Sequence, residues 1–222
     1  DKGAEMGRFN MGSTAILLFG PGMLAAPLDA YGPDGHVEVP PLLLANGRGG
    51  FSADGKSYVI QLTGDEETPL PWVNVIATPQ FGTVVTASGA AHTWAGNSRE
   101  NRLTPFENDP VTDRTAEAIF VRDDASGDAW SPTPGPMPRT SNTGPIVIQH
   151  SAGVTRFTRV TRGIRHALEV FVDASDPVKY SMLTLTNETT AIRALSVFAY
   201  NDWVLGPPRE GQSQHVKTTL DS

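Results

Sequence analysis

Residues 163–200 read GIRHALEVFVDASDPVKYSMLTLTNETTAIRALSVFAY, and this stretch decides the fold class. Within residues 164–172, Arg165 and Glu169 fall on one face of an extended chain, while His166 falls on the other face. The apolar residues that share the face of His166 are Ile164, Leu168, Val170 and Val172. A period of two residues is typical of a β-strand with one buried face.

Similar runs occur on both sides of this strand. The other predicted strands cover residues 57–62, 72–78, 81–86, 178–186 and 192–200. They are rich in β-branched and aromatic residues, and turn-forming stretches such as 173–177 and 187–190 separate them. No window keeps a period of 3.6 residues over three turns. The chain is therefore predicted to be all-β, with an antiparallel sandwich or barrel.

Composition excludes several classes of function. The 222 residues carry a net charge of −7, which disfavours binding to nucleic acid or to an anionic membrane surface. The chain has no cysteine, so it has no disulfide framework and no thiolate chemistry. The longest apolar stretch, residues 15–28, contains two glycines and two prolines and is too short to span a bilayer.

The densest polar cluster lies at residues 93–110, within a loop bounded by glycine and proline. An aromatic ring can stack on a pyranose, while amides and Arg–carboxylate pairs supply directional hydrogen bonds to hydroxyls. The candidate sugar-binding residues are Trp94, Asn97, Arg99, Glu100, Arg102, Asn108 and Asp109. The alternative is a long loop held together by its own hydrogen bonds and ion pairs.

Three other features favour structural interpretations. Residues 123–128 lack the ligand spacing of a calcium loop and are predicted to form a hairpin turn. Residues 46–51 lack the Lys-Ser/Thr of a phosphate-binding loop and are predicted to form a tight turn. No metal site is expected, because no metal-ligand spacing links the five histidines, His36, His92, His150, His166 and His215.

A family resemblance covers residues 31–222. The stretches that carry it are residues 40–62 (PPLLLANGRGGFSADGKSYVIQL), 71–85, 92–113 (HTWAGNSRENRLTPFENDPVTD), 117–134 and 163–210. They resemble the N-terminal region of the glycoside hydrolase family 94 module, in particular the phosphorylase-like module of cyclic β-1,2-glucan synthases. The resemblance implies an antiparallel β-supersandwich of the galactose mutarotase-like class. It also implies a supporting role for the loop at residues 94–109 near the substrate.

In that family an (α/α)6 barrel follows the sandwich and carries the catalytic Asp and the phosphate-binding residues. We therefore expect this chain to be an incomplete sandwich without the barrel, and without turnover of its own. Inorganic phosphate would be a co-substrate of the full enzyme, and no cofactor is expected. Missing strands would leave open sheet edges and an exposed apolar face.

Residues 1–28 differ from the rest. The sequence DKGAEMGRFNMGSTAILLFGPG resembles the C-terminal part of phosphatidylserine decarboxylase, in which a Gly-Ser-Thr motif is self-cleaved and the serine becomes a pyruvoyl group. That match places the scissile bond at Gly12–Ser13. The large preceding region of that family is missing, so pyruvoyl formation at Ser13 is not expected. We expect the junction near residues 26–31 to come from a chimeric gene model.

Three functional hypotheses follow. The first is the substrate-side sandwich of a glycan phosphorylase or cyclic β-1,2-glucan synthase, acting on a β-glucan or oligosaccharide with the missing barrel as partner. The second is a non-catalytic carbohydrate-binding module that uses Trp72, Trp94, Trp130 or Trp203. The third is a fragment of a pyruvoyl decarboxylase. A homodimer is an open alternative, and the expected location is the cytoplasm or the cytoplasmic side of a bacterial inner membrane.

Overall fold

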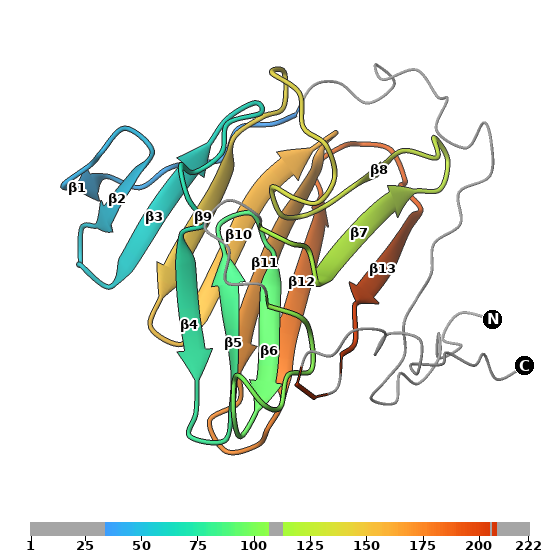
Figure 1. The fold of residues 1–222 in the computed structure, drawn as a ribbon. Coiled ribbons are helices and arrows are strands. Elements are labelled where there is room, and N and C mark those ends of the chain that lie inside the picture. The colour runs from blue at the N-terminus through green and yellow to red at the C-terminus, as the bar shows by residue number, and fades with distance from the viewer. Residues whose placement is uncertain (1–33, 107–112, 205, 208–222) are drawn as a thin grey trace, which may run out of the picture.

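The computed structural model describes residues 34–106, 113–204 and 206–207, and this part of the chain contains strands and no helix. Accordingly, it offers no helix long and apolar enough to cross a membrane. The strands form one seven-stranded sheet and two three-stranded sheets (Figure 1). Every pairing within them is antiparallel, which confirms the predicted fold class.

The seven-stranded sheet has the order β1-β2-β3-β9-β10-β11-β12. Its strands are β1 (Leu42–Leu43), β2 (Gly49–Ser52), β3 (Ser57–Leu62), β9 (Ile146–Ser151), β10 (Val154–Thr161), β11 (Ile164–Val172) and β12 (Lys179–Asn187). The second sheet consists of β4 (Val73–Ala77), β5 (Phe81–Thr86) and β6 (Ala91–Ala95). The third, in the order β13-β7-β8, consists of β7 (Glu117–Asp123), β8 (Ala129–Trp130) and β13 (Leu195–Asn201).

The main core lies between the seven-stranded sheet and the sheet β4–β6, which stands in front of it in Figure 1. Its large side chains come from both layers, with Phe157 and Leu168 on one side and Ile76 and Val85 on the other. Phe157 is fully buried. A smaller core cluster joins the third sheet to the large one through Val121, Trp130 and Ile164. The inner face of the large sheet is therefore covered by two separate small sheets.

Among the described residues, an apolar cluster covers one end of the outer face of the large sheet. Val37, with Val39 and Leu42 beside it, packs on a cluster formed by Val59, Val147 and Val160. The Gly35 N–H also donates a hydrogen bond to the Val160 carbonyl, at 3.1 Å. The segment before β2 is therefore an integral part of this layer.

The predicted strands agree closely with the observed ones. β3, β5 and β11 have the predicted bounds, and His166 is fully buried on the inner face of β11, as its alternation requires. β10 and β11 are joined by a tight turn in which Arg162 and Gly163 both have positive φ, as a type I′ hairpin requires. A Cβ atom on Gly163 would lie 2.3 Å from a methyl carbon of Thr189, so glycine is needed there.

One predicted boundary is wrong by three residues: β13 begins at Leu195 and not at residue 192. The Asn187 side chain accepts the Thr189 N–H and donates to the Ala191 carbonyl, which holds the chain in a turn. The Arg193 side chain then pairs with the fully buried carboxylate of Asp123. Because of these side-chain contacts, the strand begins three residues later than predicted. The apolar pattern of the sequence does not reveal them.

The predicted turn at residues 123–128 is confirmed, whereas the turn predicted for residues 46–51 ends at Gly49, where β2 begins. Asp123 ends β7, and its Oδ1 accepts the N–H groups of Ala125 and Ser126. Asn46 likewise accepts the N–H groups of Arg48 and Gly49 through its Oδ1. In each case the polar side chain satisfies the backbone of a turn, so neither segment is organised as a ligand loop.

Two histidines are held uncharged inside the sandwich. Burial, together with the nearby Arg159 cation, lowers the pKa of His166 to about 3. Its Nε2 accepts a hydrogen bond of 2.8 Å from the indole N–H of Trp130. Burial also lowers the pKa of His150 to about 4. An unfolded chain would bind protons at both sites near the ordinary histidine value of about 6.5.

These pKa values predict that the free energy of unfolding decreases in acid. Since the unfolded state takes up protons below about pH 6.5 while the folded state does not, stability is lost as the pH falls. Each of the two histidines contributes a slope of up to about 1.4 kcal/mol per pH unit. Between about pH 6.5 and 5 most carboxylates stay charged, so the histidines dominate this window. We expect the free energy of unfolding from urea titrations to fall there.

His166→Gln keeps an acceptor for Trp130 and removes one titrating group, so its slope in this window is expected to be smaller. His36 is exposed, and His36→Gln is the matched control that should keep the wild-type slope. Equal slopes for wild type and His166→Gln would show that the buried imidazole is not neutral.

Candidate functional site

The polar loop singled out in the sequence begins where β6 ends. Trp94 forms a β-bridge with Arg102, and the Leu103 N–H donates to the Thr93 carbonyl at 2.9 Å. The Gly96 N–H donates to the Gln80 carbonyl at 2.6 Å. The chain therefore leaves β6, turns and returns alongside itself. Residues 94–106 are called the Trp94 loop below.

The interior of the Trp94 loop is held by its own polar side chains. The Asn97 Oδ1 accepts the N–H groups of Arg99 and Glu100, each at 2.9 Å. Arg102 donates to two loop carbonyls, that of Ser98 at 3.3 Å and that of Phe106 at 2.7 Å. This is the arrangement expected of a loop that holds itself together, and it fixes the loop's shape before any ligand arrives.

Three rings are stacked at the base of the loop. The His92 ring lies 5.4 Å from that of Trp94 and 4.9 Å from that of Phe106, with interplanar angles of 28° and 17°. Trp94 also covers Gly82, where a Cβ atom would lie 2.4 Å from the indole Cζ2. The glycine in β5 is thus required for the position of the tryptophan.

A buried carboxylate clamps both ends of the loop. The Glu117 Oε1 accepts hydrogen bonds from the hydroxyls of Thr93, at 2.6 Å, and Thr104, at 2.9 Å. The Lys179 ammonium donates to the other oxygen at 2.5 Å. The Thr104 hydroxyl in turn accepts the Thr93 N–H at 2.8 Å. We call these four residues the Glu117 clamp.

The clamp is charged and the adjacent histidine is neutral. Burial alone would raise the pKa of Glu117, but the Lys179 cation and the two threonine hydroxyls outweigh it, so the pKa lies below its ordinary value. Burial lowers the pKa of His92. The His92 Nδ1 lies 2.8 Å from the Thr104 carbonyl, which can only accept, so Nδ1 carries the proton.

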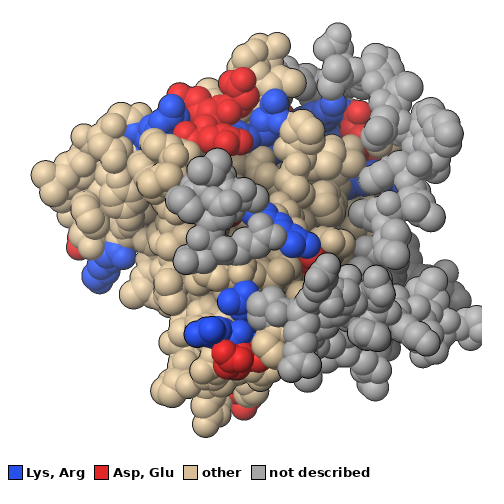
Figure 2. Space-filling model, viewed as in Figure 1, with Lys and Arg blue, Asp and Glu red and all other residues tan. Residues whose placement is uncertain are grey.

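The structure brings together five of the predicted site residues. Trp94, Asn97, Arg99, Glu100 and Arg102 all belong to the Trp94 loop. Arg99 and Glu100 form an exposed ion pair of 3.3 Å. Figure 2 shows that positive and negative side chains are scattered over the face in view. Their contact with a sugar stays a prediction. The other candidates, Asn108, Asp109 and Ser13, lie outside the described residues, as does His215.

Sequence reasoning missed the clamp. Glu117 and Lys179 are 62 residues apart, and each opens a strand that is otherwise unremarkable in sequence. Their only signal is a charged residue at an inward-facing position, and such a position can be recognised only once the sheets are assembled.

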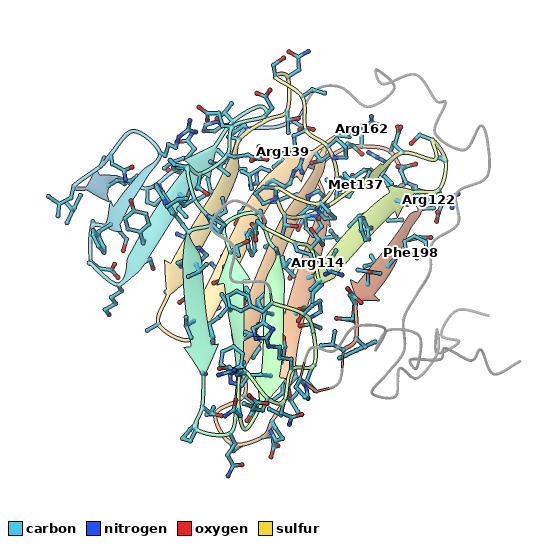
Figure 3. The ribbon with its side chains drawn as sticks, viewed as in Figure 1. Arg114, Arg122, Met137, Arg139, Arg162 and Phe198 are labelled. Atoms are coloured by element: carbon cyan, nitrogen blue, oxygen red, sulfur yellow. The ribbon has the colours of Figure 1, made fainter. Side chains whose placement is uncertain are left out.

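Two hollows flank the core. A cavity of about 570 Å³ lies behind the clamp, with Phe157, Leu168, Lys179 and Trp203 among its lining residues. A groove of about 660 Å³ has Met137 and Arg139 in its wall, and both residues are labelled in the upper part of Figure 3. Arg139 is occupied there, because it donates to the Gly64 and Glu66 carbonyls.

Two of the other tryptophans, Trp72 and Trp130, are less suited to stacking on a ligand. Trp130 is buried and donates to His166, while Trp72 packs against the main core beside Tyr58. Among the described residues no group of His, Asp and Glu could hold a metal ion. The Trp94 loop is therefore the best organised candidate for contact with a ligand.

The fold and this loop define a β-sandwich with a preformed polar loop at one end of the smaller layer. Residues 56–222 match the family model of the glycosyl hydrolase 94 supersandwich domain, and the chain belongs to that family. The match does not reach residues 1–28, so the resemblance of that stretch to phosphatidylserine decarboxylase gains no support.

Several relatives are considerably longer than this chain. Cyclic beta-(1,2)-glucan synthase NdvB of Rhizobium meliloti is 41% identical over 176 residues, which are 79% of this chain and 6% of that protein. N,N'-diacetylchitobiose phosphorylase of Vibrio proteolyticus is 25% identical over 75% of this chain and 20% of its own length. Solabiose phosphorylase of Paenibacillus borealis is 29% identical over 72% of this chain and 20% of its own length.

The clamp makes a prediction about stability. Glu117→Gln leaves the Lys179 ammonium buried without its anion, and breaking a buried pair in this way costs about 3–5 kcal/mol. Arg99→Ala removes an exposed pair, which costs about 1 kcal/mol or less. Urea unfolding compares the two variants.

Glu117→Gln combined with Lys179→Met removes both charges, and we expect it to recover much of the lost stability. A Glu117→Gln variant as stable as Arg99→Ala would contradict the assignment of a charged, buried clamp.

Proposed function

We propose that this chain forms the substrate-side β-sandwich of a larger glycan phosphorylase or cyclic β-1,2-glucan synthase, and that the Trp94 loop contacts the glycan. The observation that carries the proposal is the preformed loop, in which the exposed Arg99–Glu100 pair stands on a base fixed by the Glu117 clamp. A loop ordered in advance loses little entropy on binding.

The chemistry of the loop suits a neutral, hydroxylated ligand. The guanidinium of Arg99 donates and the carboxylate of Glu100 accepts, so together they match hydroxyl groups, which do both. The ion pair has no net charge and does not by itself select an anion. The higher identity to the glucan synthase, 41% against 25% and 29% for the two phosphorylases, favours a β-1,2-glucan as the ligand.

The bond-breaking step is assigned to another part of the enzyme. We propose that a catalytic barrel supplies the general acid and binds the inorganic phosphate, while this domain positions the chain of sugars. The described residues offer no pair of exposed carboxylates in the Trp94 loop that could divide the two roles of glycoside hydrolysis, because Glu100 is the only carboxylate between residues 94 and 106.

Binding tests the proposal. Isothermal titration of the chain with β-1,2-gluco-oligosaccharides is expected to show saturable binding, and Arg99→Ala is expected to weaken it by about tenfold through the loss of a charged hydrogen bond. Lys56→Ala, which removes an exposed cation in the turn between β2 and β3, is the control and should bind like wild type.

Chitobiose and cellobiose compared in the same titration report on linkage preference. If Arg99→Ala binds with the same affinity as wild type, the Trp94 loop is not part of the binding surface.

Turnover gives a second prediction. Incubated with β-1,2-glucan and inorganic phosphate, the chain is expected to release no glucose 1-phosphate, because the acid belongs to the proposed barrel. Measurable release by the purified chain, absent in a mock purification, would overturn the division of roles.

A further inference from the structure

We infer that the outer face of the seven-stranded sheet, beside the turn between β11 and β12, is a second binding surface for a neutral oligosaccharide. Lys179 opens β12 and reaches inward to the Glu117 clamp. Because side chains alternate along a strand, Tyr180 and Met182 point to the opposite, outer face. This surface is therefore separated from the Trp94 loop by the thickness of the sheet.

The strand register shows which side chains are neighbours on this outer face. Tyr180 lies opposite Phe171, which lies opposite Val154 on the next strand. One row further along, Met182 lies opposite Glu169, which lies opposite Arg156. We call these six residues the Tyr180 surface.

The Tyr180 surface carries an open aromatic pair. The rings of Phe171 and Tyr180 are stacked at 5.1 Å with an interplanar angle of 20°, and Tyr180 is 44% and Met182 50% exposed. The other end of the same face is covered by Val37 and its neighbours. An exposed ring with one face already packed offers its remaining surface to the C–H groups of a sugar.

Hydrogen-bonding groups lie in the adjacent row. Arg156 donates from Nε to the Glu169 Oε1 at 2.7 Å and from Nη2 to the same oxygen. These two bonds fix the orientation of the guanidinium, and the Arg156 side chain is 52% exposed. A guanidinium has five N–H groups, so three are left for other acceptors. A planar donor held in place one row from the stacked rings suits sugar hydroxyls.

The charge and the apolar area of the Tyr180 surface indicate which class of ligand it binds. Arg156 is paired with Glu169 and Arg165 with Glu188, and the adjacent turn carries Asp173 and Asp176, so this end of the face has no excess of positive charge. A nucleic acid or an anionic membrane would need an excess of positive charge. A second protein would bury about 800 Å² on each side, far more than four apolar side chains provide. A neutral glycan matches both properties.

The dimensions favour several sugar units. Tyr180 and Arg156 are two strands and one row apart, which corresponds to about 12 Å from standard strand spacing and rise. That distance exceeds a single pyranose ring, so the surface suits an oligosaccharide. The inference rests on the proposed function for the class of ligand, but it uses a different face of the molecule.

Titration of the intact chain with β-1,2-gluco-oligosaccharides tests the inference. Tyr180→Ala is expected to weaken one binding event about five- to tenfold, as the loss of one stacked ring implies. Thr184→Ala, an exposed position on the same face of β12, is the control and should have no effect. Tyr180→Phe keeps the ring and should retain binding.

Combination with Arg99→Ala separates this surface from the Trp94 loop. Independent losses for Tyr180→Ala and Arg99→Ala support two surfaces. A loss for Arg99→Ala alone overturns the inference and leaves the proposed function standing. A loss for Tyr180→Ala alone supports the surface and contradicts the proposed loop. Sedimentation that detects a dimer dissolved by Tyr180→Ala would also overturn the inference, since the face would then join two copies.

Discussion

The arrangement of this domain depends on the ion pair between Lys179 and Glu117, whose side chains are 11% and 14% exposed. Glu117 belongs to the sheet β13-β7-β8, Lys179 to the seven-stranded sheet and Thr93 to the sheet β4–β6, so the Glu117 clamp connects all three sheets. Other polar bonds join two sheets each, such as those from the Asn74 amide to the Ser151 carbonyl and from the Trp130 indole to His166. Packing sets the distance between layers, whereas a directional pair also sets how one layer is positioned along the other. The same carboxylate determines where the Trp94 loop leaves and rejoins the sandwich.

Such a clamp is a costly way to gain stability. Two ions buried in a protein interior lose their hydration, and hydrophobic residues of similar size often do as well or better. Its value here is positional, since it connects Thr93 to Thr104 and thereby closes the loop. The stacked rings of His92, Trp94 and Phe106 complete the base, and His92 stays neutral so that no uncompensated charge is buried beside them. The loop is thus ordered as the domain folds.

Much of the fold could be predicted from the sequence. The alternation at residues 164–172 predicts β11 with its buried histidine, and the missing calcium-ligand spacing at residues 123–128 correctly favours a turn. The division into three sheets could not be predicted, because pairing partners such as β3 and β9 are far apart in the chain. For the same reason, the sequence predicts only part of the candidate site. The Trp94 loop is contiguous and visible in sequence, whereas Glu117 and Lys179 become a pair only across two sheets.

The chain belongs to the glycosyl hydrolase 94 supersandwich family, and its polar loop is held together by its own side chains, which together support the proposal that this domain presents a rigid surface to a glycan. The most direct measurement is a map of backbone amide chemical shifts during titration of the chain with a β-1,2-gluco-oligosaccharide. The account predicts a cluster of shifts at residues 94–106, with little change in the turn between β2 and β3. Saturable binding that leaves residues 94–106 unshifted would contradict it.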